Sequence, residues 1–122
     1  MALAHHSLVA WQRANDLFIK LHQLSMNAFP AFERYELGGQ LRRAAFSVPS
    51  NIVEGFATAY QGKRLHFLDT ARASLAEVAY CVETAAGLGY ITEEQANSLV
   101  SEIKQVGAPL TGLIRAERRR DR

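Results

Sequence analysis

The sequence has a single cysteine, no long hydrophobic run and no large excess of either charge. Because a disulfide needs two thiols, Cys81 excludes an internal disulfide and favours a reducing, cytoplasmic setting. The apolar runs are far shorter than the roughly 20 residues that cross a bilayer, and the first residues show no signal-peptide pattern. We therefore expect a cytoplasmic protein that does not enter a membrane.

The composition is that of an ordinary globular domain, with 48% hydrophobic and 21% charged residues in a chain of 122. The formal net charge is +2, but residues 115–122 hold five arginines against Glu117 and Asp121. That segment has a surplus of three positive charges, and the other 114 residues sum to −1. We predict one domain over residues 1–122, with a core at about 9–114 and a basic C-terminal end at 115–122. This end is either an arm for phosphates or a solvated helix end whose cations suit the helix dipole.

Apolar residues recur at helical spacing in four segments, and no segment shows the alternation typical of a strand. The first runs over about 11–28 and stops at Phe29-Pro30, the second starts near Phe32 or Glu33, the third covers about 63–88, and Thr92 caps the fourth. Four amphipathic helices joined by short loops predict an all-α four-helix bundle. The predicted buried face of the first helix is Trp11, Ala14, Phe18, Leu21, Leu24 and Ala28.

The second segment contains Pro49, which lacks an N–H and crowds the carbonyl of Ala45. Either the helix kinks and continues, or it stops and restarts. A restart has a ready cap, because Asn51 and Glu54 have the spacing of a capping box. The predicted buried face of this helix is Leu41, Ala44, Ala45, Val48, Ile52 and Phe56.

A polar stripe runs along the same segment at spacings of three and four residues, so its members share one helical face. Two interpretations remain open: a solvated surface, or a buried or interfacial polar network in which the charged members need partners on other helices. The stripe consists of Glu36, Gln40, Arg43, Ser47, Asn51 and Glu54, with Arg42 at its edge.

The stretches "LRRAAFSVPSNIVEGF" and "HFLDTARASLAEV" resemble the signature of the four-helix-bundle proteins encoded in intervening sequences of bacterial 23S rRNA genes. The resemblance covers about Val9 to Leu113. It implies an up-and-down four-helix bundle with a Pro-kinked second helix, assembled as a ring that is most often a homopentamer. A related group, the accessory proteins of diversity-generating retroelements, is similar in fold and assembly and is expected to bind nucleic acid and a reverse transcriptase. The positions implied to hold the kinked helix and the subunit contacts are Arg43, Ser47, Pro49, Asn51 and Glu54.

The chain departs from this family in the third helix, where Ala73-Ser74 stands in place of a Gly-Ser pair. The extra methyl group of Ala73 is expected at a close helix contact, where it would alter the local packing.

The sequence has no pattern that indicates an enzyme, a cofactor or a metal site. No acidic residue is followed by a histidine three positions later, as the paired-metal sites of helical bundles require, and His5-His6 is expected in a frayed terminus. Cys81 has no basic neighbour on its own helix to favour a thiolate. The glycine pairs lack the strand and lysine of a phosphate-binding loop. The family itself has no established catalytic activity, so we predict a non-enzyme with no cofactor.

The predicted function is a homo-oligomeric interaction module of unestablished role that binds RNA or DNA through basic surface patches. Apolar side chains outside the main stripes, such as Ile19 and Tyr80, are expected to contact other subunits. The alternative is a small-ligand-binding or enzymatic bundle with a pocket at the Pro49 kink, lined by Arg43 and Glu54. The candidate nucleic-acid contacts are Arg34, Arg42, Lys63, Arg64, Arg118, Arg119 and Arg120.

Overall fold

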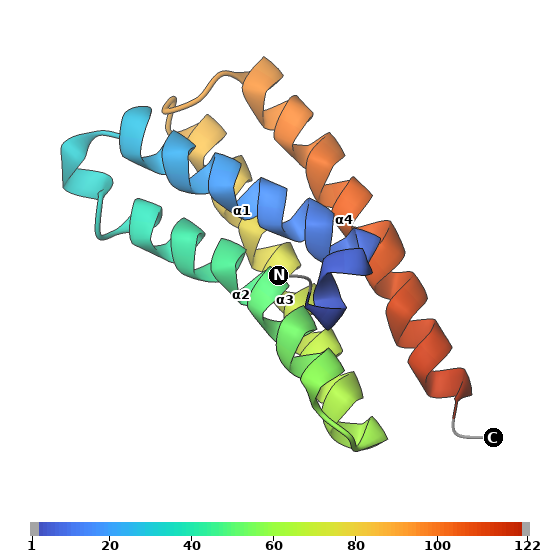
Figure 1. The fold of residues 1–122 in the computed structure, drawn as a ribbon. Helices are drawn as coiled ribbons and strands as arrows, with labels where there is room; N and C mark the ends of the chain where they lie inside the picture. The colour runs from blue at the N-terminus through green and yellow to red at the C-terminus, as the bar shows by residue number, and fades with distance from the viewer. Residues whose placement is uncertain (1–2, 121–122) are drawn as a thin grey trace.

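A computed structural model describes residues 3–120, and four long helices account for most of them (Figure 1). Within this range no residue forms a strand, so the prediction of an all-α fold is confirmed. Helix α1 is preceded by a short 3₁₀ turn, η1, and a second such turn, η2, lies between α1 and α2. The elements in chain order are η1 Ala4–Ser7, α1 Val9–Asn27, η2 Ala31–Glu33, α2 Leu37–Ala57, α3 Gln61–Gly87 and α4 Glu93–Arg119.

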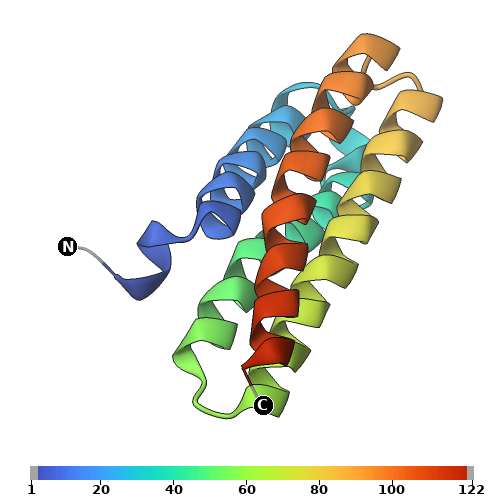
Figure 2. The same ribbon diagram turned by 90° about the vertical axis from the view of Figure 1, so that its right-hand side faces the viewer.

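The helices follow one another around the bundle in chain order. Helix α1 packs against α2 and α4, and α3 packs against the same two helices, whereas within residues 3–120 the diagonal pairs bring no Cα atoms within 8 Å of each other. Short connections reverse the direction at each step (Figures 1 and 2). The prediction of an up-and-down four-helix bundle is therefore confirmed.

Local signals fix two of the helix ends. The predicted cap Thr92 starts α4: its hydroxyl accepts from the Gln95 backbone N–H (3.0 Å), and the Gln95 side chain accepts from the Thr92 backbone N–H (2.8 Å). Helix α3 ends at Gly87, and Gly89 just after it has a φ of 80°, a left-handed conformation that glycine adopts without a steric penalty. The Tyr90 N–H then donates to the Ala85 carbonyl (2.9 Å), which completes a Schellman motif.

Helix α2 begins later than predicted, at Leu37 instead of near Phe32 or Glu33. The reason is that residues 31–33 form the separate turn η2, and the Glu33 carboxylate then accepts from the Leu37 backbone N–H at 3.1 Å. The turn passes close to the new helix, because a Cβ on Gly38 would lie 2.8 Å from the Glu33 carbonyl oxygen. Only glycine permits that approach.

The core lies between the four helices, and the predicted buried face of α2 is confirmed except that Phe56 is only half-buried. The predicted face of α1 is confirmed at Ala14 and Leu21; Trp11, Phe18 and Leu24 lie half-buried at the edge of the core, and the prediction is wrong for Ala28, which is exposed. Phe18 packs edge-to-face on Phe46 of α2 instead, with ring centroids 5.4 Å apart. The residues of α1 that are buried are Ala10, Ala14, Leu17, Leu21 and Ser25.

Helix α2 runs through Pro49 without a break, so the alternative in which the helix stops and restarts at Asn51 is wrong. Asn51 lies inside the helix, where its amide donates to the Ser47 carbonyl (2.8 Å) instead of capping a helix start. A kink at Pro49 stays a prediction.

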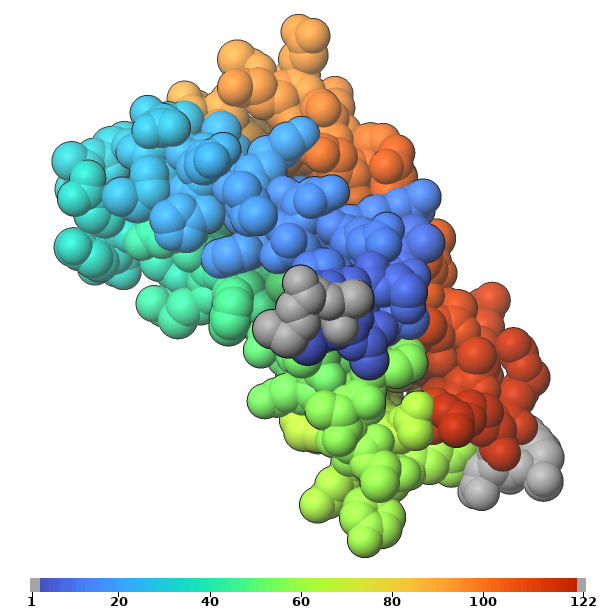
Figure 3. Space-filling view, in the orientation of Figure 1, coloured from blue at the N-terminus to red at the C-terminus, as the bar shows by residue number. Residues whose placement is uncertain are grey.

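The bundle has one end with all four helices and one end with only three. Helix α1 starts well short of the place where α2 ends, α3 starts and α4 ends, and η1 turns aside over α2 (Figures 2 and 3). His5 and His6 lie in that turn, half-buried, with ring centroids 4.6 and 5.3 Å from that of Trp11. The expectation of a frayed segment is therefore wrong for these two histidines, because they pack on Trp11. None of the described helices is long and apolar enough to cross a membrane.

Candidate functional site

The three-helix end of the molecule carries a cluster of exposed cations. The start of α3 and the end of α4 lie side by side there, as shown by the ion pair between Arg64 Nε and Glu117 Oε1 at 3.3 Å. Two groups of candidate residues that are about 50 positions apart in the sequence therefore share one surface. We call this surface the basic end, and it comprises Lys63, Arg64, Arg115, Arg118, Arg119 and Arg120.

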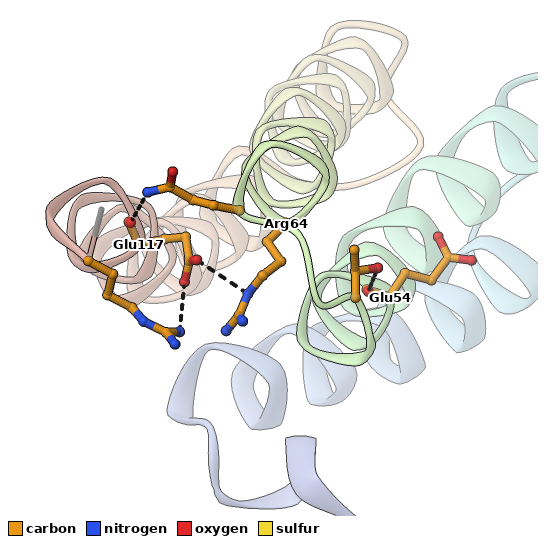
Figure 4. A network of polar contacts seen from close by, with 6 residues as sticks. Glu54, Arg64 and Glu117 are labelled. Carbon is orange, nitrogen blue, oxygen red and sulfur yellow. Dashed lines mark hydrogen bonds and ion pairs between the residues drawn. The ribbon is translucent and has the colours of Figure 1, made fainter. Parts of the chain in front are cut away.

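A buried carboxylate organises the basic end. The Glu117 side chain is only 7% exposed; its Oε1 forms the ion pair with Arg64 Nε, and its Oε2 accepts a hydrogen bond from Arg120 Nη1 at 3.2 Å. The Gln61 side chain donates to the Glu117 backbone carbonyl at 2.8 Å. In Figure 4, Arg64 reaches from α3 toward Glu117, whereas the Glu54 carboxylate on α2 points away from both. The network therefore joins α3 to α4 and leaves Glu54 outside it.

Glu117 was missed as a functional residue by the sequence analysis, which counted it only as a charge. A signal was present, because Glu117 follows Leu110 and Ile114 at helical spacing and so continues the buried face of α4. A carboxylate at such a position predicts a cationic partner, since an unpaired buried charge is costly. The identity of the partner, Arg64, was not readable from local sequence.

The other cations of the basic end differ in how close they lie to a partner side chain and in how exposed they are. Arg118 lies 3.8 Å from the Asp69 carboxylate, and the Lys63 ammonium lies 5.9 Å from the Tyr60 ring centroid. Lys63, Arg118 and Arg119 are exposed. Asp121 and Arg122, which the sequence analysis counted with this segment, lie outside the described residues.

Arg34 and Arg42 lie at the opposite end of the bundle. Arg42 donates to the Ser25 hydroxyl (3.0 Å) and to the Arg34 backbone carbonyl (2.6 Å), so it fastens α2 to α1 and to the turn after η2. Arg34 is exposed. The seven candidate cations therefore do not form one surface, and contact of any of them with nucleic acid stays a prediction.

Only the two middle residues of the polar stripe of α2 are partly shielded from solvent. The Ser47 hydroxyl forms a 2.7 Å hydrogen bond with the Ser74 hydroxyl of α3, and the Asn51 amide donates to the Ser47 hydroxyl at 2.9 Å. Both Ser47 and Asn51 are half-buried. The remaining members, Glu36, Gln40, Arg43 and Glu54, are exposed.

Each of the two interpretations of the stripe thus holds for part of it. Arg43 and Glu54 make no ion pair with any residue between 3 and 120. A role for either residue in subunit contacts stays a prediction.

The departure at Ala73-Ser74 does not disturb the bundle. Ala73 is exposed, so the expectation that its methyl group lies at a close helix contact within the chain is wrong. Ser74 is the residue that contacts α2, through its hydroxyl.

An apolar groove lies beside Pro49, between α1, α2 and the N-terminal turn. It has a volume of about 380 Å³ and adjoins a second hollow of about 270 Å³, with which it shares His5 and Val53. Phe46, on its edge, is 54% exposed despite its size. Arg43 is not part of the groove. We call the two hollows together the apolar groove, and its lining residues are Leu3, Ala4, His5, Trp11, Asn15, Phe46, Pro49, Ser50, Val53, Glu54, Phe56 and Ala57.

Cys81 lies in the core between the helices. Burial, with a smaller effect from the charge of Glu77, raises the pKa of its thiol above the usual value, which disfavours the reactive thiolate. No cluster of three or more His, Cys, Asp or Glu side chains suited to a metal ion occurs in the described range.

Comparisons with known proteins place this geometry in context. The sequence model of the 23S rRNA-intervening sequence proteins matches residues 6–112. A crystal structure of a protein of unknown function from the S23 ribosomal protein family of Bacteroides thetaiotaomicron VPI-5482 is similar, with a TM-score of 0.80 at 20% identity. The similarity covers 87% of this chain and 98% of that chain, and at this identity it is one of fold alone. No curated protein matches the chain.

Proposed function

Because the chain belongs to the family of 23S rRNA-intervening sequence proteins, we propose that it is a non-catalytic interaction module that assembles with copies of itself. A ring of five chains is the assembly we expect. A cytoplasmic location is part of the proposal, and the unpaired, buried Cys81 is compatible with that reducing compartment.

The observation that carries the proposal is the apolar groove with Phe46 at its edge. One side of the Phe46 ring packs on Phe18, and 54% of the residue remains accessible in a single chain. Exposed apolar surface that is continuous along a groove marks an interaction site more often than scattered apolar residues do. Ile19 of α1 is also exposed (46%), as the sequence analysis expected for a subunit contact.

The proposed occupant of the apolar groove is a second copy of the chain. A groove on one copy that meets a different surface of the next copy generates a ring whenever the rotation between them closes. Charge complementarity supports such a contact, because the exposed Glu54 at the groove suits the exposed arginines of the basic end of a neighbour.

The substitution Phe46→Asp tests self-association. It places a charge in the apolar groove, and since Phe46 is half-exposed in the single chain we expect the helical content to survive. Sedimentation velocity should then show single chains where the unsubstituted protein shows a larger particle. The matched control is Tyr35→Asp, at a residue that is 80% exposed outside the groove, and it should leave the particle intact. An unchanged particle in Phe46→Asp would contradict a contact through this groove.

Binding of RNA or DNA by the basic end is a second candidate function. The specific observation in its favour is that Lys63, Arg118 and Arg119 are all exposed at the end of the bundle where the start of α3 lies beside the end of α4. Phosphate contacts by such residues are independent of base sequence and weaken steeply with salt. A ring would repeat the basic end five times, so weak sites would gain affinity through multivalency.

The triple substitution of Lys63, Arg118 and Arg119 by alanine tests the second candidate. Fluorescence anisotropy with a short single-stranded RNA should show affinity that falls with salt, and the triple variant should bind more weakly and with a shallower salt slope. Equal affinity of the two proteins across the salt series would rule the basic end out.

The small-ligand alternative at Pro49 ranks below these two. The groove that lies there is open and mostly apolar, and among the described residues His5 and Glu54 are the only ionisable side chains in its lining. Small-molecule sites usually enclose their ligand and place several polar groups around it.

A further inference from the structure

A small hollow lies within the basic end, between the start of α3 and the end of α4. Its volume is about 150 Å³, which is more than a single water molecule needs. The hollow is lined by Ala59, Gln61, Arg64, Glu117 and Arg120.

We propose that this hollow is a binding site for a single phosphate group, held by the guanidinium groups of Arg64 and Arg120. The deduction starts from its hydrogen-bonding groups. Among the described residues Glu117 provides the only carboxylate of the lining, with Oε1 paired to Arg64 Nε at 3.3 Å and Oε2 accepting from Arg120 Nη1 at 3.2 Å. Most of the remaining hydrogen-bonding groups of the hollow are therefore guanidinium donors, which a ligand with acceptor oxygens would satisfy.

Arg64 is one source of unused donors. Its Nε is engaged with Glu117, whereas its two terminal nitrogens have no hydrogen-bond partner among residues 3–120. A guanidinium group carries five N–H donors in a planar fork, and this fork matches the oxygens of a phosphate in a two-bond contact. Arg120 likewise uses only Nη1 in the described contacts.

The Arg64 fork is held in place before any ligand arrives. Its side chain is only 17% exposed, its guanidinium carbon lies 5.8 Å from the Phe56 ring centroid, and its Nε is fixed on the buried carboxylate of Glu117. A group that is ordered in advance loses less conformational entropy when it binds, so the contact with a ligand is stronger.

The charge of the hollow also suits a phosphate. Two arginines and one glutamate leave a net charge of +1, and the exposed Lys63 and Arg119 add to the positive field. The nearby Asp69 is already engaged by Arg72 at 2.8 Å and by Arg118 at 3.8 Å. Among residues 3–120, an anion in the hollow thus faces no carboxylate without a cationic partner.

The phosphate group has two sources, inorganic phosphate or the phosphates of a nucleic-acid strand. Only the second source rests on the proposed nucleic-acid function. The phosphate site itself stands on the geometry of Arg64, Glu117 and Arg120.

Titration with inorganic phosphate at constant ionic strength, followed by NMR of the arginine Nε–H and glutamine side-chain signals, tests the site. We expect saturable shifts of Arg64 and Gln61. Arg64→Lys keeps the charge and a partner for Glu117 but loses the fork, so phosphate affinity should fall about tenfold. Arg120→Gln, at a side chain that is 61% exposed, should weaken binding several-fold without affecting the fold, and it remains informative if Arg64→Lys is poorly folded.

The matched control is Arg34→Gln, which removes the same charge at the opposite end of the bundle and should change phosphate affinity less than twofold. Shifts that do not saturate would overturn the proposal. So would losses of equal size in Arg34→Gln and Arg120→Gln, because they would show an effect of net charge alone.

A short RNA, with and without a 5′-phosphate, separates the sources and separates this proposal from the nucleic-acid function. Weaker RNA binding by Arg64→Lys than by the unsubstituted chain supports a phosphate of the strand in the hollow, and a preference for the 5′-phosphorylated RNA identifies that phosphate as the terminal one. RNA binding that is unchanged in Arg64→Lys, together with phosphate shifts that do not saturate, overturns the site and leaves the nucleic-acid function standing. Saturable phosphate shifts with no RNA binding support the site and contradict the nucleic-acid function.

Discussion

The Tyr90 hydroxyl donates a 2.6 Å hydrogen bond to the Glu33 carboxylate, which joins the loop between α3 and α4 to the turn before α2. The other oxygen of the same carboxylate accepts from the Leu37 backbone N–H at the start of α2. One side chain of a three-residue turn thus fixes where α2 begins and which loop lies against it.

Substitution of Tyr90 by phenylalanine should lower the melting temperature at pH 8, because it removes this hydrogen bond and frees Glu33 to move. The hydrogen bond to Glu33 raises the pKa of Tyr90 above its ordinary value of 10.0. A pKa that is higher in the folded state gives a stabilising contribution that is complete below the unfolded pKa and is lost as the pH rises through the folded pKa.

Thermal melts of the two proteins by circular dichroism at pH 8 and above pH 10 check this expectation. The difference in melting temperature should shrink at the higher pH. A difference that stays constant would show that the Tyr90 hydroxyl does not contribute through the Glu33 contact.

Substitution of Arg64 by methionine should destabilise the bundle by about 2 kcal/mol, because it leaves the buried Glu117 carboxylate with only one cation. The double variant Arg64→Met/Glu117→Leu removes both charges, and apolar replacement of a buried pair is often close to neutral. We expect the double variant to recover to within about 1 kcal/mol of the unsubstituted chain.

Urea unfolding of the two single variants and the double variant measures this coupling. If the two single effects simply add in the double variant, Arg64 and Glu117 are not coupled, and the network does not hold α3 to α4.

Substitution of Ser74 by alanine should cost about 1 kcal/mol of stability, because the half-buried Ser47 hydroxyl then loses its partner across the α2–α3 contact. Ala73→Gly serves as a comparison on the same helix. Since Ala73 is exposed, its replacement by glycine should also cost about 1 kcal/mol, but through helix propensity alone.

Urea unfolding of the double variant Ser47→Ala/Ser74→Ala distinguishes the loss of the hydrogen bond from the loss of helix propensity. Removal of Ser47 as well should add little to the loss in Ser74→Ala, whereas Ser47→Ala and Ala73→Gly should be additive. Additive losses for Ser47 and Ser74 would contradict the hydrogen bond between them.

The Cys81 thiol should react slowly with a disulfide reagent near pH 8, because it is buried and its pKa is raised by burial and by Glu77. In the folded protein the rate should be at least on the order of 100-fold lower than in urea, where reaction no longer waits for local opening. Absorbance of the released thiolate follows both rates. Equal rates in buffer and in urea would place Cys81 at the surface.

Those parts of the fold that depend on local signals were predictable from the sequence. The stop at Phe29-Pro30, the cap at Thr92 and the apolar face of α2 are confirmed, because a cap or a periodic stripe acts over a few residues. The start of α2 was wrong because residues 31–33 form a separate turn, in which the Glu33 carboxylate accepts from the Leu37 N–H and also from Tyr90, 57 residues further along the chain. The restart at Pro49 was wrong because the buried face of α2 continues on both sides of the proline, and its packing outweighs the local preference.

The candidate site was less predictable because it depends on long-range packing. The sequence named Lys63, Arg64 and Arg118 to Arg120, but only the bundle brings the start of α3 to the end of α4. The sequence also suggested Arg42 as a nucleic-acid contact, but in the structure its guanidinium donates a hydrogen bond to the Ser25 hydroxyl. The apolar groove depends on the short α1 and on the turn that packs His5 and His6 against Trp11.

The mass of the particle in solution, measured by light scattering across a concentration series, tests self-association most directly. We predict the mass of about five chains over the whole series, with helical content unchanged. The mass of one chain at every concentration would contradict self-association and would leave Phe46 and the apolar groove open to solvent or to another partner.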